Sequence, residues 1–371
     1  MMKRIFLFFT ILFLFVACGD GVETFHGTSL PISPHTDNLM RYAQNVMVSE
    51  TDSGYLVSVC NPWDTAFLLG QYRICEPFER VVCYSATQWS VFEKLGEINR
   101  VKGILEGRYV NDSTMRVMLD AGAVQDVGTE AQANVECLIA LQPDIILYTP
   151  YSGGGKDASW HVSTTLSNTV MFPFADYLET TPLGRAEWIR VVGILCGRRA
   201  EADAWFDEIE RRYLSLKSLC DSVENRPTVF SDLPFNGQWY VAGGQSYIAQ
   251  LFADAGADYV WRDNNRAGSV PLDFESILAR AQHADFWRVA NSPSQPMTYA
   301  SLERDVNNCK LFDAFANRKI MVCDIIPTGY FEHSQMEPDV LLADFIWFFH
   351  LELLTGEWEN YQPKYYHWMN Y

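Results

Sequence analysis

The sequence has few basic residues for its length, and this excludes one large class of partners. Its 371 residues include 28 Lys and Arg against 46 Asp and Glu, which gives a formal net charge of −18. Nucleic-acid binding needs a basic face that contacts phosphates, and adhesion to anionic lipid headgroups also needs basic clusters. The chain is therefore not expected to bind nucleic acid, and charge alone is not expected to hold it to a membrane.

Recognisable catalytic and metal-binding motifs are also missing. The sequence contains no GxSxG nucleophile elbow, no HExxH pair and no CxxC pair. The glycine-rich segment 153–156 fails the phosphate-binding pattern GxxxxGK[ST], because Pro150 takes the place of its first glycine and Asp157 follows Lys156. The sequence thus predicts no enzyme activity, no metal site and no cofactor of the protein's own.

The N-terminus has the pattern of an export signal. Lys3 and Arg4 precede the apolar run 5–16, which is too short to cross a bilayer comfortably. The Ala17-Cys18 pair that follows resembles a lipoprotein cleavage site, with Cys18 as the lipidated first mature residue, and a plain secretory signal is the alternative. Several of the other eight cysteines lie in apolar runs, which predicts mostly buried thiols.

One supersecondary unit occurs twice and predicts the fold class. In residues 127–151, Asn134 is placed to cap a short helix, and the apolar run 145–148 follows as a buried strand. Residues 272–289 repeat this order, with Asp273 as the cap. A helix followed by a strand and a loop is the unit of an open α/β sheet, in which ligands bind at the carboxyl ends of the strands. Two copies of the unit predict two similar lobes.

The order and spacing of four segments resemble a known family. The segments are residues 79–96 (ERVVCYSATQWSVFEKLG), 134–147 (NVECLIALQPDIIL), 241–261 (VAGGQSYIAQLFADAGADYVW) and 337–350 (EPDVLLADFIWFFH). Over residues 77–354 the chain is similar to the bacterial substrate-binding proteins of ABC importers for iron chelates, haem and cobalamin. The resemblance implies an α/β fold of two Rossmann-like lobes with central parallel sheets. One long helix would join the lobes, and the ligand cleft would lie between them.

The predicted domain organisation follows from these patterns. It comprises a lipoprotein signal peptide (1–17), a tether and N-terminal extension (18–75), an N-terminal α/β lobe (76–181), an interlobe helical segment (182–225) and a C-terminal α/β lobe (226–371). In the extension, residues 55–60 and 67–74 predict a hairpin. Near the end of the chain, residues 359–370 are expected to pack back as a strap. A continuous helix from Ala200 to Val223 would measure about 36 Å, which is long enough to join the lobes.

Aromatic residues supply most of the candidate ligand contacts. They make up 14% of the chain, and many fall in predicted loops at strand ends. Their faces suit a large, partly apolar ligand such as a tetrapyrrole or an aryl-rich chelate, although core packing accounts for each of them equally well. Arg262 can pair with ligand carboxylates or, alternatively, with Asp263 or Asp258 at the surface. The candidate ligand-binding residues are Trp89, Glu130, Tyr151, Trp239, Tyr240, Trp261, Arg262 and Tyr330.

The resemblance also implies a function and its partners. It implies a monomeric periplasmic protein that is anchored by lipid on Cys18, expected at the inner membrane. The protein would capture an iron chelate (siderophore), haem or a corrinoid, so that any iron or cobalt belongs to the ligand, and deliver it to a permease dimer. Cobalamin-binding members carry an aromatic residue where this chain has Glu130 and another near Gly268, so the resemblance favours cobalamin less.

Two glutamates are candidates for contact with the permease. Family members place one glutamate in each lobe to bridge arginines of the permease, and Glu136 and Glu275 stand at these positions here. The alternative is that each carboxylate, in the first turn of its helix, only interacts favourably with the helix dipole.

Two other functions remain open at this point. A tetrapyrrole chelatase has a similar two-lobed fold and would need a histidine and a carboxylate facing each other across the cleft, such as His161 with Glu275. An accessory lipoprotein of an outer-membrane receptor would be sorted to the other membrane. The Gly19-Asp20 pair after the cysteine gives no clear sorting signal.

Overall fold

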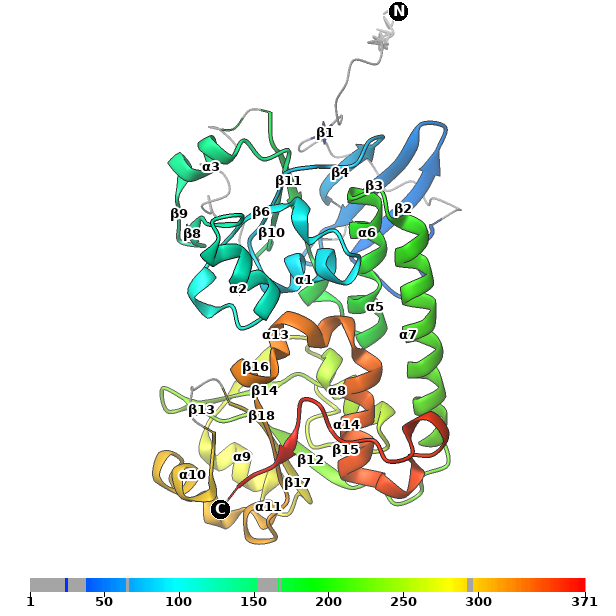
Figure 1. Cartoon of the computed structure of the whole chain (residues 1–371). Helices are drawn as coiled ribbons and strands as arrows, with labels where there is room; N and C mark the ends of the chain where they lie inside the picture. Colours follow the sequence, from blue (N-terminus) through cyan, green and yellow to red (C-terminus); the bar gives the residue numbers. More distant parts are fainter. Residues whose placement is uncertain are drawn as a thin grey trace, which may run out of the picture.

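Two lobes lie side by side along one long helix (Figure 1). This computed structural model describes residues 38–64, 67–151, 166, 168–291 and 296–370, together with the backbone of the short strand β1 (Thr24–Phe25). Each lobe contains a five-stranded sheet with helices packed around it. The predicted α/β fold with two lobes is therefore confirmed.

The N-terminal lobe is built on a parallel sheet in the order β11-β10-β5-β6-β7. Its strands are β5 (Val81–Cys83), β6 (Val101–Ile104), β7 (Gln125–Asp126), β10 (Ile145–Tyr148) and β11 (Val170–Pro173). The helices between them are α1 (Ala86–Lys94), α2 (Ser113–Asp120) and α3 (Val135–Leu141), and the short strands β8 (Gly128–Thr129) and β9 (Gln132–Ala133) precede α3. Strands β5 and β10 are apolar along their length, as is typical of parallel strands that are covered on both faces.

The N-terminal extension forms an antiparallel sheet that is attached to this lobe. Strands β2 (Val46–Thr51), β3 (Gly54–Cys60) and β4 (Leu68–Ile74) join β1 in the order β1-β4-β3-β2, which confirms the predicted hairpin. Two buried carboxylates hold the chain that leads into β2. Glu187 accepts the N–H groups of residues 41–43, and Glu179 accepts those of residues 44–45. The extension is therefore an integral part of the lobe.

Three helices follow one another in the segment between the lobes, and the longest of them connects the lobes. They are α5 (Pro182–Ala186), α6 (Trp188–Leu195) and α7 (Arg199–Leu219). The 21 residues of α7 span about 32 Å at 1.5 Å per residue, so the helix ends four residues earlier than the predicted one. It packs against α6 and against α14 (Pro338–His350), a helix of the other lobe. The predicted connection by one long helix is confirmed.

The C-terminal lobe has a sheet in the order β15-β12-β17-β18-β19. Its parallel strands are β12 (Thr228–Ser231), β15 (Asp258–Tyr259), β17 (Phe286–Asn291) and β18 (Ile320–Asp324), and β19 (His367–Trp368) pairs antiparallel with β18. The predicted return of the C-terminal strap is thus confirmed. The helices are α8 (Tyr247–Asp254), α9 (Phe274–Ala281), α10 (Tyr299–Asp305), α11 (Asp313–Ala316), α12 (Ile325–Thr328) and α13 (Tyr330–His333). A small antiparallel sheet contains β13 (Pro234–Phe235), β14 (Gln238–Ala242) and β16 (Ser269–Leu272).

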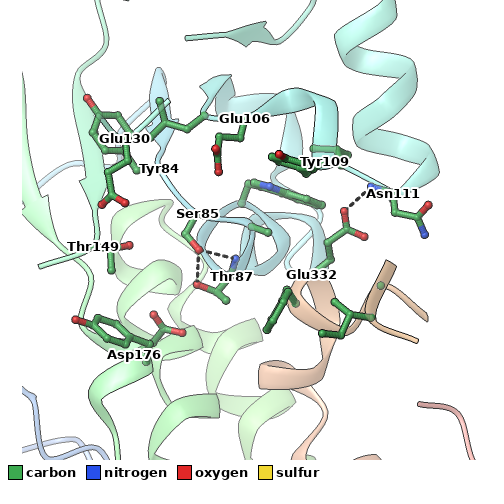
Figure 2. Close-up of a pocket in the computed structure, with 18 of the residues that line it drawn as sticks. Tyr84, Ser85, Thr87, Glu106, Tyr109, Asn111, Glu130, Thr149, Asp176 and Glu332 are labelled. Atoms are coloured by element: carbon green, nitrogen blue, oxygen red, sulfur yellow. Dashed lines mark hydrogen bonds between the residues drawn. The ribbon is translucent and has the colours of Figure 1, made fainter. Parts of the chain in front are cut away.

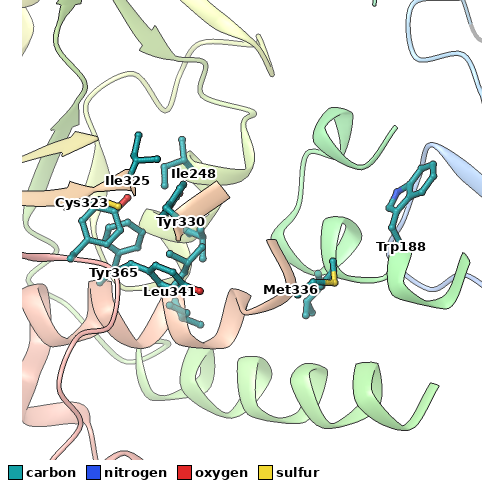
Figure 3. Packing of buried hydrophobic residues seen from close by; sticks show 14 of the residues in the cluster. Trp188, Ile248, Cys323, Ile325, Tyr330, Met336, Leu341 and Tyr365 are labelled. Carbon is teal, nitrogen blue, oxygen red and sulfur yellow. The ribbon is translucent and has the colours of Figure 1, made fainter. Parts of the chain in front are cut away.

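Three aromatic residues that were predicted to bind ligand lie in the core of this lobe. Trp239 is 1% exposed, and its ring lies 5.8 Å from that of Trp287. Tyr330 packs edge-on against Tyr365 within the buried cluster that Figure 3 shows, and Trp261 is buried as well. Because packing between elements covers these rings, they belong to the core, which corrects the expectation that they line the cleft.

Two further features concern the cysteines and the lengths of the helices. All eight cysteines in the described part of the chain are free thiols, and five of them are buried, as predicted. Among the helices of the described residues, none combines the length and the apolar character needed to cross a bilayer.

Candidate functional site

A cavity of about 590 Å³ lies between the lobes. Most of its wall comes from the loops after β5, β6, β10 and β11 of the N-terminal lobe, and residues 325–332 close it from the C-terminal lobe. The cavity is thus at the carboxyl ends of parallel strands, where open α/β sheets bind ligands. Its volume is in the range of small-molecule and cofactor sites.

Aromatic rings cover much of this wall. The aromatic residues that line the cavity are Tyr84, Trp89, Tyr109, Tyr151, Tyr177 and Phe331. Tyr109 and Phe331 are 62% and 57% exposed although both are large, and the Arg108 guanidinium lies over the Tyr109 ring at 4.6 Å from its centroid. The rings of Tyr151 and Tyr177 lie 6.1 Å apart. Such a wall suits a broad, partly apolar ligand.

The polar part of the wall is acidic. Figure 2 shows the four carboxylates that line the cavity, Glu106, Glu130, Asp176 and Glu332. None of the described lining residues is Lys or Arg. The hydroxyl of Tyr151 donates to Oε2 of Glu130 at 3.1 Å, and burial together with this carboxylate raises the pKa of Tyr151. The described wall therefore carries an excess of negative charge and of hydrogen-bond acceptors.

Asp176 is the most deeply placed of these acceptors. It is 2% exposed, and its Oδ2 lies 3.6 Å from Nη2 of Arg185 without a hydrogen bond to a described atom. Burial raises the pKa of the Asp176 carboxyl, and the Arg185 guanidinium opposes that rise. Asp176 therefore takes part in the cavity wall as the acidic member of a buried ion pair.

Glu332 connects the two lobes at the edge of the cavity. Its Oε1 accepts the backbone N–H group of Asn111 at 2.7 Å (Figure 2). The same oxygen accepts the N–H group of Asp112 at 3.2 Å, and both donors belong to the N-terminal lobe. Its other oxygen, Oε2, is buried and has no partner among the described residues.

The structure brings three of the predicted ligand-binding residues to the cavity. Trp89, Glu130 and Tyr151 line it, and of these Trp89 is itself only 1% exposed. Tyr240 and Arg262 are exposed but are not part of its wall, and Arg262 pairs with Asp258 at 3.3 Å, as the alternative interpretation held.

Sequence reasoning missed several lining residues, among them Tyr109, Tyr177, Asp176 and Phe331. Tyr109 follows β6, and Asp176 and Tyr177 follow β11. Their position shortly after an apolar strand could therefore have identified these residues. Only other aromatic residues were chosen by this criterion.

The two glutamates predicted to contact a permease lie on the surface. Glu136 and Glu275 are exposed in the first turns of α3 and α9, and neither pairs with another described residue. The predicted caps are confirmed, because Asn134 and Asp273 accept N–H groups of their own helices. Figure 1 shows both helices on the side of the molecule away from α7.

The remaining predicted residues lie either outside the cavity or outside the residues that the structure describes. Glu275 lies on the outer surface of α9, so it is not part of the cavity wall, where a chelatase would need a carboxylate. His161 and the lipidation candidate Cys18 lie outside the described residues.

Known proteins resemble this chain in sequence and in fold. A family model described as periplasmic binding protein matches residues 81–326. An uncharacterized lipoprotein of Methanocaldococcus jannaschii is 27% identical over 300 residues, which are 78% of this chain and 69% of that protein. A cobalamin-binding protein of Halobacterium salinarum is 26% identical over 202 residues, and the match spans 54% of this chain and about half (51%) of the relative.

Solved structures share the fold. The S. aureus protein IsdE, crystallised with haem, superposes with a TM-score of 0.56 at 17% identity, over 74% of this chain and 100% of that one. The matched family and these structural neighbours are binding proteins, not enzymes.

Proposed function

The chain belongs to the periplasmic binding protein family, and from this we propose that it captures a metal chelate between its lobes and delivers it to the permease of an ABC importer. The ligands in question are an iron chelate, haem and a corrinoid. Because iron or cobalt would arrive inside the ligand, capture needs no cofactor of the protein's own. We propose that the protein acts as a monomer, held at the inner membrane by lipid on Cys18.

The choice among these ligands rests on the charge of the cavity wall. Four carboxylates and no described Lys or Arg line it. Arg108 lies 3.9 Å from Glu106, and Arg185 lies 3.6 Å from Asp176. These two arginines offset part of the negative charge, and the carboxylates still outnumber them. An anionic catecholate chelate or the propionates of haem would meet like charge there, which is unfavourable in a partly desolvated site. A corrinoid instead carries many side-chain amides that donate hydrogen bonds, and Asp176 and Glu130 offer acceptors. We therefore favour a corrinoid.

Two further points support this choice. Glu130 stands in place of an aromatic residue, which disfavoured cobalamin at first, but Tyr151 contacts that glutamate and supplies a ring at the same part of the wall. The relative from Halobacterium salinarum is named a cobalamin-binding protein and matches over about half of its length.

A titration series tests the ligand. Cyanocobalamin, haemin and a ferric catecholate are each added to the purified protein, and quenching of tryptophan fluorescence gives the three dissociation constants. We expect cyanocobalamin to bind most tightly, and Glu130→Gln with Glu106→Gln to weaken cyanocobalamin while improving the anionic catecholate. Tighter binding of the catecholate or of haemin by the unsubstituted protein would overturn the choice of a corrinoid.

Localisation is tested by fractionation. With Cys18→Ser the protein should be released by osmotic shock, and the unsubstituted protein should sediment with inner membranes. Recovery of the unsubstituted protein with outer membranes would favour an accessory lipoprotein of an outer-membrane receptor instead.

A further inference from the structure

A cluster of three potential metal ligands joins the lobes next to the cavity. Glu93 of α1 and Asp112, the N-cap of α2, come from the N-terminal lobe, whereas His333 of α13 comes from the C-terminal lobe. One ligand atom of each lies within 4.8 Å of those of the other two. Nε2 of His333 is 3.8 Å from Oδ2 of Asp112, which is too far for a hydrogen bond. Two carboxylates and an imidazole from both lobes thus converge without bonding to one another.

Two buried polar atoms, one in this cluster and one in the residue next to it, lack a hydrogen-bond partner among the described residues. Nδ1 of His333 is buried and makes no hydrogen bond to a described residue, and the same holds for Oε2 of Glu332, a residue that is only 6% exposed. Both side chains border the space above Gly329, where an added Cβ would lie 3.2 Å from Oε2 of Glu332 and 3.4 Å from Nε2 of His333. Buried polar atoms without partners are rare and need a physical explanation.

The charge of the cluster points to a cation. Carboxylate oxygens of Glu93 and Asp112 lie within 4.8 Å of each other, and two like charges at this separation repel each other. The nearest lysine in the sequence, Lys94, points to a different carboxylate, that of Glu337 at 2.8 Å. A bound cation would favour both ionised carboxylates and use the imidazole nitrogen at the same time.

We propose that a first-row divalent transition-metal ion binds Glu93, Asp112 and His333 and so bridges the two lobes. Carboxylate oxygen and imidazole nitrogen form a donor set that suits such ions. Because metal–ligand bonds measure about 2.0–2.2 Å, the three donors must approach one another slightly, and the bound ion then links the two lobes. The site does not depend on the proposed capture of a chelate, since it consists of protein side chains alone.

Co²⁺ is a suitable probe for this site. Purified full-length protein in detergent is stripped with EDTA, freed of the chelator and titrated with CoCl₂ while the absorbance spectrum is recorded. We expect one ion per chain, with weak visible bands and without the intense near-ultraviolet band of a cobalt–thiolate bond, which would report one of the cysteines. The melting temperature should rise with the Co²⁺ concentration, because an ion that binds only the folded protein stabilises it.

Conservative variants locate the ion. Asp112→Asn keeps a good N-cap for α2, and His333→Gln keeps a polar side chain of similar reach. Each should weaken Co²⁺ binding by more than the roughly 10–100-fold that loss of an outer-shell partner costs. The matched control is His283→Gln, at an exposed histidine 2.9 Å from Asp313, and it should leave binding unchanged.

Three results would overturn the proposal. They are the absence of saturable binding, a thiolate band at one equivalent, and full binding by the variant that carries both Asp112→Asn and His333→Gln. Melting curves without metal check that each variant folds, and Glu93→Gln replaces any variant that does not.

Discussion

The two lobes use their aromatic residues differently. In the N-terminal lobe, Tyr109 and Tyr151 follow strands of the sheet and stand exposed on the cavity wall. In the C-terminal lobe, Trp239 lies within 6.0 Å of Phe312 and close to Trp287, and all three are buried. In both lobes the first strand of the main sheet, β5 or β12, has a neighbouring strand on each side. Strand order therefore does not explain why the aromatic residues are exposed in one lobe and buried in the other.

The difference comes from what covers the strand ends. Trp239 belongs to the small sheet of the C-terminal lobe, and its Nε1–H donates to the carbonyl oxygen of Ser231, the last residue of β12. The lobe therefore closes this strand end with its own side chain. In the N-terminal lobe the ends of β5, β6 and β10 lead directly into the cavity wall. A strand end is a binding site only where its own lobe leaves it open.

The largest effect is expected at the covered strand end. Trp239→Ala should lower the free energy of unfolding by about 3–5 kcal/mol, because it removes a fully buried ring from a packed core. Chemical denaturation measures this loss. Ligand affinity per folded molecule should stay the same, since the ring does not reach the cavity. Unchanged stability with weakened binding would contradict the contrast between the lobes.

A smaller effect is expected where the lobes are tied together. Glu337 binds Lys94 of the N-terminal lobe at 2.8 Å and also pairs with Lys364, and these contacts, against the opposing effect of burial, lower the pKa of the Glu337 carboxyl to about 2 from 4.5. Because the folded value is the lower one, the stabilisation is complete above pH 4.5 and disappears as the pH falls from about 4.5 to about 2. A shift of this size corresponds to roughly 3 kcal/mol.

The free energy of unfolding as a function of pH checks this prediction. The curve for the unsubstituted protein should fall more steeply between pH 4.5 and 2 than the curve for Glu337→Gln, in which the titrating carboxyl is gone. Parallel curves for the two proteins would mean that the carboxylate is not held in its ionised form by the two lysines.

Local sequence signals were sufficient for the elements of the fold but not for the cavity wall. Asn134 and Asp273 cap their helices as predicted, because capping depends on residues within one turn. Whether an aromatic ring at a strand end is exposed depends on segments far away in the sequence, so Trp239 and Tyr109 could not be told apart. His333 was a possible cleft residue from the sequence, but its meeting with Glu93 and Asp112 could not be predicted, because α13 brings the histidine from the other lobe.

A moderate effect on binding is expected at the open wall. Tyr151→Ala should weaken ligand binding about tenfold, because one stacking contact contributes roughly 0.5–1.5 kcal/mol and ~1.4 kcal/mol is a factor of ten. Phe331→Ala should act similarly from the C-terminal lobe. Both side chains are exposed, so stability should change by less than about 0.5 kcal/mol.

Titration with cyanocobalamin measures these affinities. The matched control is Tyr240→Ala, which removes an exposed tyrosine outside the cavity and should not affect binding. Equal losses for Tyr240→Ala and Tyr151→Ala would place the ligand elsewhere.

At the proposed contacts with the permease we expect the smallest effect on the isolated protein. The two lobes should contribute equally to these contacts. Glu136 and Glu275 are exposed at corresponding positions of α3 and α9, so replacing both with lysine should leave ligand affinity unchanged. The melting temperature should fall only slightly, because a carboxylate in a first helical turn contributes about 0.3–1 kcal/mol. Uptake by cells and stimulation of the transporter's ATPase in vesicles should nevertheless be lost, since charge pairs at an interface set the encounter rate and the register.

Single variants sharpen this last comparison. If each lobe contacts one half of a permease dimer, Glu136→Lys and Glu275→Lys should reduce transport to a similar extent, in contrast to the unequal shares of the lobes in the cavity. The control with the same change in net charge is Glu50→Lys with Glu224→Lys, two exposed glutamates on β2 and beyond the end of α7. Normal transport by the Glu136→Lys, Glu275→Lys protein would reduce both residues to helix stabilisation. Equal loss of transport in the control would show that overall charge, and not these two sites, governs docking.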